Sequence, residues 1–277
     1  MDNLIFTYSA IILYLACSAL LFFHLKRPAN KAADIADDKA GPLSKKQIIM
    51  MGLAALCLHA LALYSDINTS AGIDLGFFHA LSLVGAVIVL FTLIAVWRHP
   101  VDILAVVLLP LAAISMFVDS INNAQHLLEP DSSNALIFHI LTSIIAYSIL
   151  ALAALQAVLL SIQNKFLHDH QPGGLIRLMP PLRNMEVLLF EVIIVGFLAL
   201  TISLGSGLIF LENMFEQQLA HKTILSILAW FVFLTLLIGH WKLGWRGRTA
   251  IRWTLSGFAS LMLAYFGSKF VLEIVLV

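Results

Sequence analysis

Histidine is the residue type most able to do chemistry in this sequence, because ten histidines occur in a chain that is 61% hydrophobic. His59 lies about five residues before the end of one apolar run, while His79 and His139 lie about five residues after the starts of two others. At about 1.5 Å per residue, all three are roughly 7–8 Å below one membrane boundary. His221 begins a further run at the same boundary. Three histidines from separate segments are therefore predicted to share one level, and His221 lies at the membrane boundary on the same side.

Imidazoles at a common level are suited to three kinds of chemistry. Neutral rings ligate haem iron or another metal ion, and they relay protons. An ionisable group inside a membrane is costly to bury, which makes it a candidate for a functional site. The structural alternative is that each histidine hydrogen-bonds a neighbouring helix and helps to hold the helices together. The residues alone leave these interpretations open.

The residues after His139 strengthen the case for that position. Thr142, Ser143, Ala146 and Tyr147 follow it at spacings of three, four, seven and eight residues, which places them on one face of a helix. This small, partly polar stripe suits close packing beside a planar ligand. An ordinary interface between two membrane helices has the same character.

The elements that position these residues are predicted from length and hydropathy. The chain has 12% charged residues and a mean hydropathy of +0.96, whereas soluble domains have about 25% charged residues. Crossing about 30 Å of hydrocarbon takes about 20 residues in a helix. Eight runs meet or approach that length, at about 4–25, 46–64, 74–97, 102–119, 134–163, 186–211, 221–240 and 250–276. The predicted fold class is all-α, a polytopic bundle of eight transmembrane helices that forms a single integral membrane domain over residues 1–277.

The orientation follows from the cationic residues in the connections between these runs. Six of them lie in or beside the first connection, near residues 26–46, and none lies in the second or the fourth. The positive-inside rule then places the odd connections in the cytoplasm and both termini outside. Four tryptophans near the predicted cytoplasmic helix ends agree with this topology: Trp97, Trp241, Trp245 and Trp253. We therefore expect a multi-pass protein of a bacterial inner membrane.

Several functional classes are disfavoured by what the sequence contains. Its 16 basic residues are dispersed among loops and balanced by 16 acidic residues, so we expect no nucleic-acid partner. Cys17 and Cys57 both lie inside apolar runs and form no C-x-x-C pair, which argues against a thiol–disulfide carrier and against covalent haem attachment. No nucleotide-binding, kinase or zinc-protease motif occurs, so the sequence predicts a protein that is not an enzyme.

Charged residues near the predicted cytoplasmic side suggest further roles. Glu191 lies inside an apolar helix, and we expect it to pair with a cation such as Arg246, Arg248 or Arg252. The cationic cluster at residues 244–248 can fix the orientation of the protein in the membrane and bind the headgroups of membrane lipid.

An ordered series of short pieces in the second half of the chain points to a known family. The pieces are Phe138-His139-Ile140, 178–182 (Leu-Met-Pro-Pro-Leu), 185–191 (Met-Glu-Val-Leu-Leu-Phe-Glu), 204–207 (Leu-Gly-Ser-Gly), 221–223 (His-Lys-Thr), 244–247 (Gly-Trp-Arg-Gly) and 265–269 (Tyr-Phe-Gly-Ser-Lys). This series, from His139 to the C-terminus, resembles the cytochrome c assembly protein family, which includes the CcsA, CcmC and HemX proteins. The likeness is greatest to its short bacterial inner-membrane members. Before His139 the likeness is limited to hydropathy and helix number.

The resemblance implies haem handling. By this likeness His139 stands at the place of an outer haem-ligating histidine, and His240 stands near that of an intramembrane histidine. The tryptophan-rich W-W-D loop of the ligase members is expected around residues 211–222, where this sequence has no tryptophan. The resemblance therefore implies a haem-binding accessory or assembly factor rather than a ligase, with haem b held by His139 and by His79, His59 or His221.

Two alternatives from other classes remain. The first is a partner subunit without haem that regulates or stabilises another membrane protein. The second is a small-ion transporter that uses the outer histidines. Haem, other membrane proteins and membrane lipid are thus the expected partners.

Overall fold

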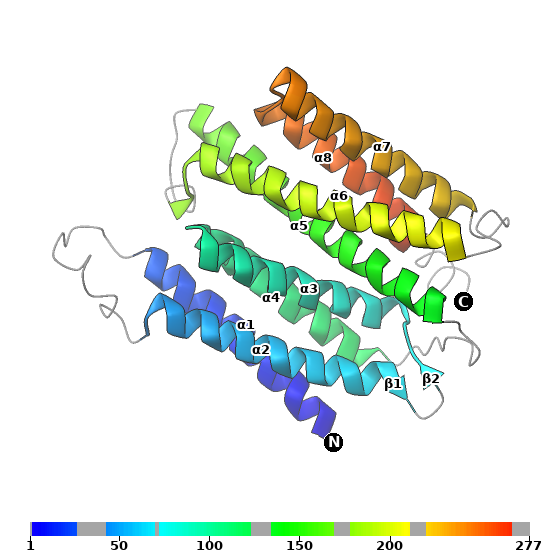
Figure 1. Cartoon of the computed structure of the whole chain (residues 1–277). Helices are drawn as coiled ribbons and strands as arrows, with labels where there is room; N and C mark the ends of the chain where they lie inside the picture. Colours follow the sequence, from blue (N-terminus) through cyan, green and yellow to red (C-terminus); the bar gives the residue numbers. More distant parts are fainter. Residues whose placement is uncertain are drawn as a thin grey trace. The chain divides into compact units, whose positions relative to one another are not determined.

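The computed structural model describes residues 2–26, 43–69, 72–122, 134–168, 178–210 and 220–267. Most of them are helical (Figure 1). The helices are, in chain order, α1 (Asp2–Leu25), α2 (Lys45–Ile67), α3 (Phe77–Arg98), α4 (Asp102–Ile121), α5 (Asn134–His168), α6 (Leu182–Phe210), α7 (Ala220–Leu243) and α8 (Gly247–Met262), which continues as the π-helix η3 (Leu263–Gly267). A short antiparallel pair, β1 (Asn68–Thr69) and β2 (Gly72–Ile73), lies between α2 and α3. The predicted all-α fold class is confirmed.

Helices α1 to α7 are each long and apolar enough to cross a membrane, with mean hydropathies of 2.0 to 2.6 over their most apolar windows. Large apolar side chains, such as Ile5 and Ile209, are exposed on them, as expected where lipid is the solvent. Helix α8 has 16 residues, which is shorter than a membrane span, and the predicted run continues beyond the described residues. The chain is therefore a polytopic helical protein, while the eighth crossing and the orientation stay predictions.

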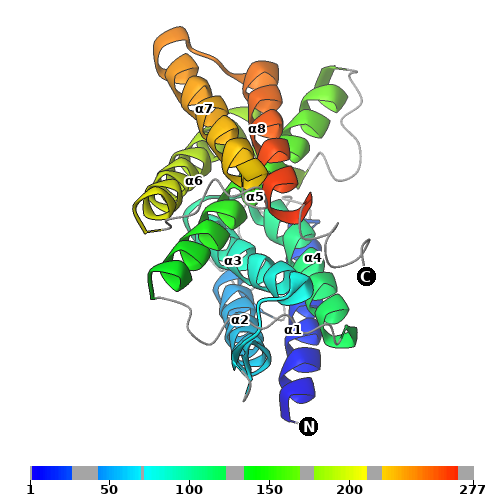
Figure 2. The same cartoon turned by 90° about the vertical axis from the view of Figure 1, so that its right-hand side faces the viewer.

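The helices form two compact units, α1–α4 and α5–α8. In the first unit each helix contacts the next one along the chain, and α4 packs back against α1 (Figures 1 and 2). In the second unit the same cyclic order joins α5, α6, α7 and α8, with α8 against α5. Each unit is thus a four-helix bundle with its own interior. The boundary between the units, after Leu127, falls in the connection between the fourth and the fifth predicted helices.

Small residues allow close helix contacts in the second unit. In α5, Ala146, Ala153 and Ala157 are buried together with Leu150, along the face that packs against other helices of its unit. A Cβ atom at Gly196 of α6 would lie 2.6 Å from a side-chain carbon of Leu150. Membrane helices associate through such small residues, because lipid offers no hydrophobic driving force for their association.

The turn between α7 and α8 explains the sequence Gly-Trp-Arg-Gly. Gly244 and Gly247 have φ angles of +66° and +55°, a left-handed conformation that favours glycine. The backbone N–H of Trp245 donates to the carbonyl oxygen of Gly239 at 3.1 Å, which closes the end of α7. A Cβ atom at Gly239 would lie only 2.3 Å from the ring of Trp245. The turn therefore fixes Trp245 against the last turns of α7.

Candidate functional site

His139 lies near the start of α5, and its ring faces α6. The ring Nδ1 is 3.0 Å from the backbone oxygen of Ser203 and 3.1 Å from Oγ of Ser206. A carbonyl oxygen can only accept a hydrogen bond, so Nδ1 carries the ring hydrogen and donates it. Nε2 is then the basic nitrogen of the neutral ring, and no described residue hydrogen-bonds to it. Metal-ligating histidines are commonly fixed in this way, with one nitrogen held by a backbone carbonyl.

Three serines position the His139 ring. Oγ of Ser143, one turn further along α5, donates to the backbone oxygen of His139 at 2.7 Å and lies 2.7 Å from Oγ of Ser203. Oγ of Ser206 donates to the carbonyl oxygen of Ser203 at 2.8 Å. Ser203 and Ser206 are both buried. The segment Ser203 to Gly207 thus supplies a carbonyl and a hydroxyl to the histidine.

The stripe that follows His139 serves two interfaces of the second unit. Ser143 contacts α6, as described above. Further along the stripe, the ring of Tyr147 packs against Phe258 of α8 and Tyr265 of η3, with centroid distances of 5.3 and 5.6 Å. The stripe is therefore a helix-packing surface for most of its length.

His59 of α2 is completely buried and uses both ring nitrogens. Its Nδ1 is 3.2 Å from the hydroxyl of Tyr14 in α1, and its Nε2 is 3.0 Å from Oγ of Ser82 in α3. The ring therefore joins three helices of the first unit. Binding iron through either nitrogen would break one of these bonds and leave a buried hydroxyl unpaired, at a cost of about 1–3 kcal/mol. These contacts fit the structural alternative for His59.

His79, in the first turn of α3, lies between two carboxylates. Its Nδ1 is 2.7 Å from Oδ1 of Asp119 in α4, and its Nε2 is 3.8 Å from Oδ2 of Asp74. Oδ1 of Asp74 accepts from the backbone N–H of Gly76 at 3.0 Å, which fixes this carboxylate just before α3. Both carboxylates are almost fully buried. Each ring nitrogen of His79 therefore faces a carboxylate oxygen.

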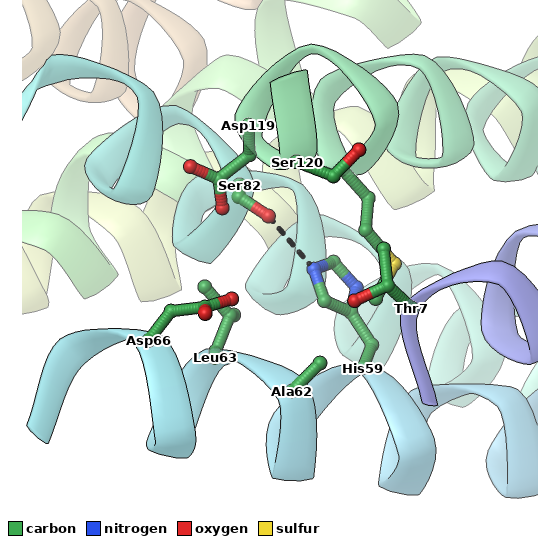
Figure 3. Close-up of a pocket in the computed structure, with 9 residues that line it drawn as sticks. Thr7, His59, Ala62, Leu63, Asp66, Ser82, Asp119 and Ser120 are labelled. Carbon is green, nitrogen blue, oxygen red and sulfur yellow. Dashed lines mark hydrogen bonds between the residues drawn. The ribbon is translucent and has the colours of Figure 1, made fainter. Parts of the chain in front are cut away.

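A cavity of about 10 Å³ lies beside His59 in the first unit (Figure 3). Asp66, Ser82, Asp119 and Ser120 contribute to its lining. This volume is close to the minimum that one water molecule needs, and polar partners are present on several sides. Within the described residues, no three histidine, cysteine, aspartate or glutamate side chains are arranged to hold a metal ion. The arrangement suits a water-bridged hydrogen-bond network among α2, α3 and α4.

His240 lies in the last turn of α7. This end of α7 is at the other end of the second unit from the start of α5 (Figure 1). Its Nδ1 is 2.9 Å from the backbone oxygen of Trp245, so this ring also donates from Nδ1. The ring stacks on Phe190 of α6, with centroids 3.5 Å apart and planes 17° from parallel. No described residue hydrogen-bonds to its Nε2 either.

The same ring lines a cavity of about 270 Å³. Arg183, Glu186, Glu191 and Arg246 supply the charged part of its lining. Oε1 of Glu186 accepts from the backbone N–H of Gly247 at 2.8 Å, so this carboxylate caps the start of α8. The expected pairing of Glu191 with a cation stays a prediction, although Arg246 lines the same cavity.

The five candidate histidines are divided between the two units. His59 and His79 belong to α2 and α3, whereas His139, His221 and His240 belong to α5 and α7. The side chain of His221 lies outside the described residues. Which histidine pairs with His139 on one iron atom therefore stays a prediction.

Several partners of these histidines were not singled out from the sequence. Asp119 carried a usable signal, because it is a carboxylate inside a predicted span. Ser82 and Tyr14 carried none, since hydroxyl residues are ordinary in membrane helices and only the packing shows which of them meets a histidine. The carbonyl of Ser203 is a backbone group, so no residue type in the sequence could indicate it.

Comparison with known proteins gives a family match over most of the chain. Residues 47–276 match the model of the family described as cytochrome C assembly protein. The chain is similar to inner membrane protein YpjD of Escherichia coli, with 31% identity over 238 residues that cover 83% of this chain and 88% of that protein. It is also similar to a 28.8 kDa protein in a nifR3-like 5' region of Azospirillum brasilense, with 32% identity over 140 residues, 50% of this chain and 52% of that protein.

These matches extend the resemblance noted in the sequence. The family match begins at residue 47, whereas the ordered motifs in the sequence begin at residue 138. The helices before residue 138 consist mainly of interchangeable apolar residues, so they contain no distinctive ordered motifs. Seven apolar helices and an inner-membrane relative confirm a multi-pass inner-membrane location.

Proposed function

Because the chain belongs to the cytochrome c assembly protein family, we propose that it is a non-enzymatic, haem-binding accessory or assembly factor of the bacterial inner membrane. The family relationship supports haem handling in general, and the proposed cofactor is haem b. A ligase reaction is not proposed, because residues 211–222, where ligase members carry the W-W-D loop, contain no tryptophan.

The fixed ring of His139 is the observation that carries this proposal. Its Nδ1–H donates to the carbonyl oxygen of Ser203, 3.0 Å away. Nε2, which carries the lone pair, is therefore the ring atom available to bind a metal. A ring oriented in advance loses little freedom when it binds iron. His139 would thus hold the iron from one side, and bound haem would supply the redox-active, transferable iron porphyrin.

The contacts of the rings also rank the candidates for a second ligand. His59 would have to give up Tyr14 or Ser82, and His79 has a carboxylate at each nitrogen. His221 begins α7, in the same unit as His139. We therefore favour His221 over His59 and His79 as the residue that would supply the second ligand.

His240 has the same donor pattern as His139 but a different setting. Four charged side chains line its cavity, Arg183, Glu186, Glu191 and Arg246, whereas cofactor sites are lined predominantly by hydrophobic and aromatic side chains. We therefore assign no haem to His240, despite its place by resemblance.

The test is the visible spectrum of protein purified in mild detergent from cells with ample haem. We expect a low-spin, six-coordinate b-type spectrum, and we expect His139→Ala to lose it or to leave five-coordinate, high-spin haem. His168→Ala is the matched control, because His168 is exposed at the far end of the same helix. His221→Ala should convert the spectrum to high spin, if it supplies the second ligand.

A colourless wild-type protein that takes up no added haemin would overturn this proposal. The histidines would then act only as hydrogen-bonding groups between helices, as His59 does in this structure. The partner-subunit alternative would become the better explanation. Ion flux in liposomes containing the protein would instead support the transporter alternative.

A further inference from the structure

Two carboxylates face one cavity at the end of the first unit that the sequence predicts to be extracytoplasmic. Asp66 near the end of α2 and Asp119 near the end of α4 both line the cavity beside His59, and their side chains extend toward one another (Figure 3). We propose that Asp66 and Asp119 bind one proton between them, which is taken up from the extracytoplasmic side. This inference goes beyond the proposed function, and neither depends on the other.

The charges around the cavity require a proton. Nδ1 of His79 is 2.7 Å from Oδ1 of Asp119, so that carboxylate has an imidazole as its partner. Asp66 instead accepts a hydrogen bond from the side-chain amide of Asn3, which carries no charge. The lysines and arginines that the structure describes in this unit lie at the opposite helix ends: Lys26, Lys45, Lys46 and Arg98. Two negative charges at one site are costly, and a proton shared by the two carboxylates removes one of them.

Asp102, a buried carboxylate at the other end of α4, is satisfied in a different way. Its Oδ1 is 2.7 Å from Nζ of Lys45 in α2. An ammonium group therefore balances Asp102, and this carboxylate needs no proton. The two ends of the same bundle thus differ in the cation that is available to a carboxylate of α4 and its neighbours.

The other groups that face the two carboxylates add no fixed positive charge. Three hydroxyl residues complete the polar lining of the cavity: Thr7, Ser82 and Ser120. Oδ2 of Asp74 is 3.8 Å from Nε2 of His79, so it adds a negative charge on the other side of that imidazole. The ring of His59 contacts only the hydroxyls of Tyr14 and Ser82, a pattern that a neutral ring satisfies.

Asp66 is the residue through which the proton enters. It is only partly buried and lies one residue before the end of α2, whereas the side chain of Asp119 is 6% exposed. A proton from the aqueous phase outside therefore meets Asp66 before it meets Asp119. The hydrogen bond from Asn3 holds the entry carboxylate against α1.

Infrared spectroscopy of the full-length protein in detergent at pH 7 tests the proposal, because a protonated carboxyl group has its own carbonyl stretching band. We expect the wild type to show such a band, with the intensity of one carboxylic acid per chain and a shift in D2O. Asp66→Asn should remove it, because Asp119 then remains alone with His79 as a charged pair. Asp66→Glu, which restores a carboxylate, should retain it. A band that is unchanged in Asp66→Asn, or absent from the wild type, would overturn the proposal.

Matched variants test the assignment further. Asp102→Asn should leave the band unchanged, because its carboxylate is paired with Lys45, and loss of the band there would contradict the assignment to Asp66 and Asp119. Asp119→Asn should also lose the band, and if that variant does not fold, the half-buried Asp66 still carries the test. Sodium chloride, compared with choline chloride at the same pH, should not reduce the band. A loss with sodium alone would overturn the proton in favour of a metal cation.

Discussion

Replacing His59 with leucine removes the two hydrogen bonds that join α1, α2 and α3. Tyr14 and Ser82 then lose their partner on this ring, although both residues are completely buried. Leucine occupies a similar space and keeps the apolar contacts, so the change isolates the hydrogen bonds. We expect the free energy of unfolding to fall, without any loss of haem.

The size of this effect follows from the two unpaired hydroxyls. In soluble proteins each buried group left unpaired costs about 1–3 kcal/mol, or about 2–6 kcal/mol for the pair. Hydrogen bonds between membrane helices average only about 0.6 kcal/mol, or about 1.2 kcal/mol for two. We therefore expect His59→Leu to cost at least about 1 kcal/mol. The triple variant Tyr14→Phe/His59→Leu/Ser82→Ala should recover most of this loss, because no unpaired group then remains.

Reversible unfolding in mixed detergent micelles measures these free energies, and the visible spectrum of the same samples reports haem. The single variants Tyr14→Phe and Ser82→Ala complete the cycle and show how much each bond contributes. A His59→Leu protein of unchanged stability that has lost its haem spectrum would refute the structural role. His59 would then be an iron ligand, and the ranking of second ligands above would be wrong.

Three further outcomes follow from the structure and the sequence. Asp119→Asn should destabilise the first unit by about 3–5 kcal/mol in the same unfolding assay, because it breaks a buried pair with His79; a loss below 1 kcal/mol would contradict that pair. Gly239→Ala should cost about 1–3 kcal/mol through its clash with Trp245, and Trp245→Ala in the same chain should relieve the clash. A cysteine placed at Lys31 in a cysteine-free background should react with an impermeant reagent only after the membrane is opened, and labelling in intact cells would reverse the predicted orientation.

The helices were predictable because a membrane imposes a length and a composition on each of them. All eight predicted runs overlap a helix, and the ends differ mainly where a helix extends past its apolar part, as α5 does to His168. The division into two four-helix bundles was not predictable in the same way. Helices α1 to α7 are apolar around most of their circumference, so hydropathy does not indicate which of their faces packs against which neighbour.

The candidate residues were predictable by type and depth, but their roles were not. His59, His79 and His139 share one predicted level, yet their partners differ completely: two hydroxyls, two carboxylates, and one carbonyl with one hydroxyl. Apart from Asp74, which lies just before the helix of His79, these partners come from other helices, so no spacing in the sequence links them to the histidine. A backbone carbonyl such as that of Ser203 leaves no trace in the side-chain sequence at all.

The number of engaged ring nitrogens gives a physical criterion for separating ligands from structural histidines. A ring bonded at both nitrogens, like His59, has to lose a bond before it binds iron, whereas a ring bonded only at Nδ1, like His139, has already paired that nitrogen. The two rings that are hydrogen-bonded only at Nδ1, His139 and His240, belong to the second unit, whereas His59, which is bonded at both nitrogens, belongs to the first. The first unit is therefore held together by its histidines, while the second keeps ring nitrogens available for a ligand. For this reason we propose that haem binds to α5–α8, and that the polar groups of α1–α4 stabilise their own bundle.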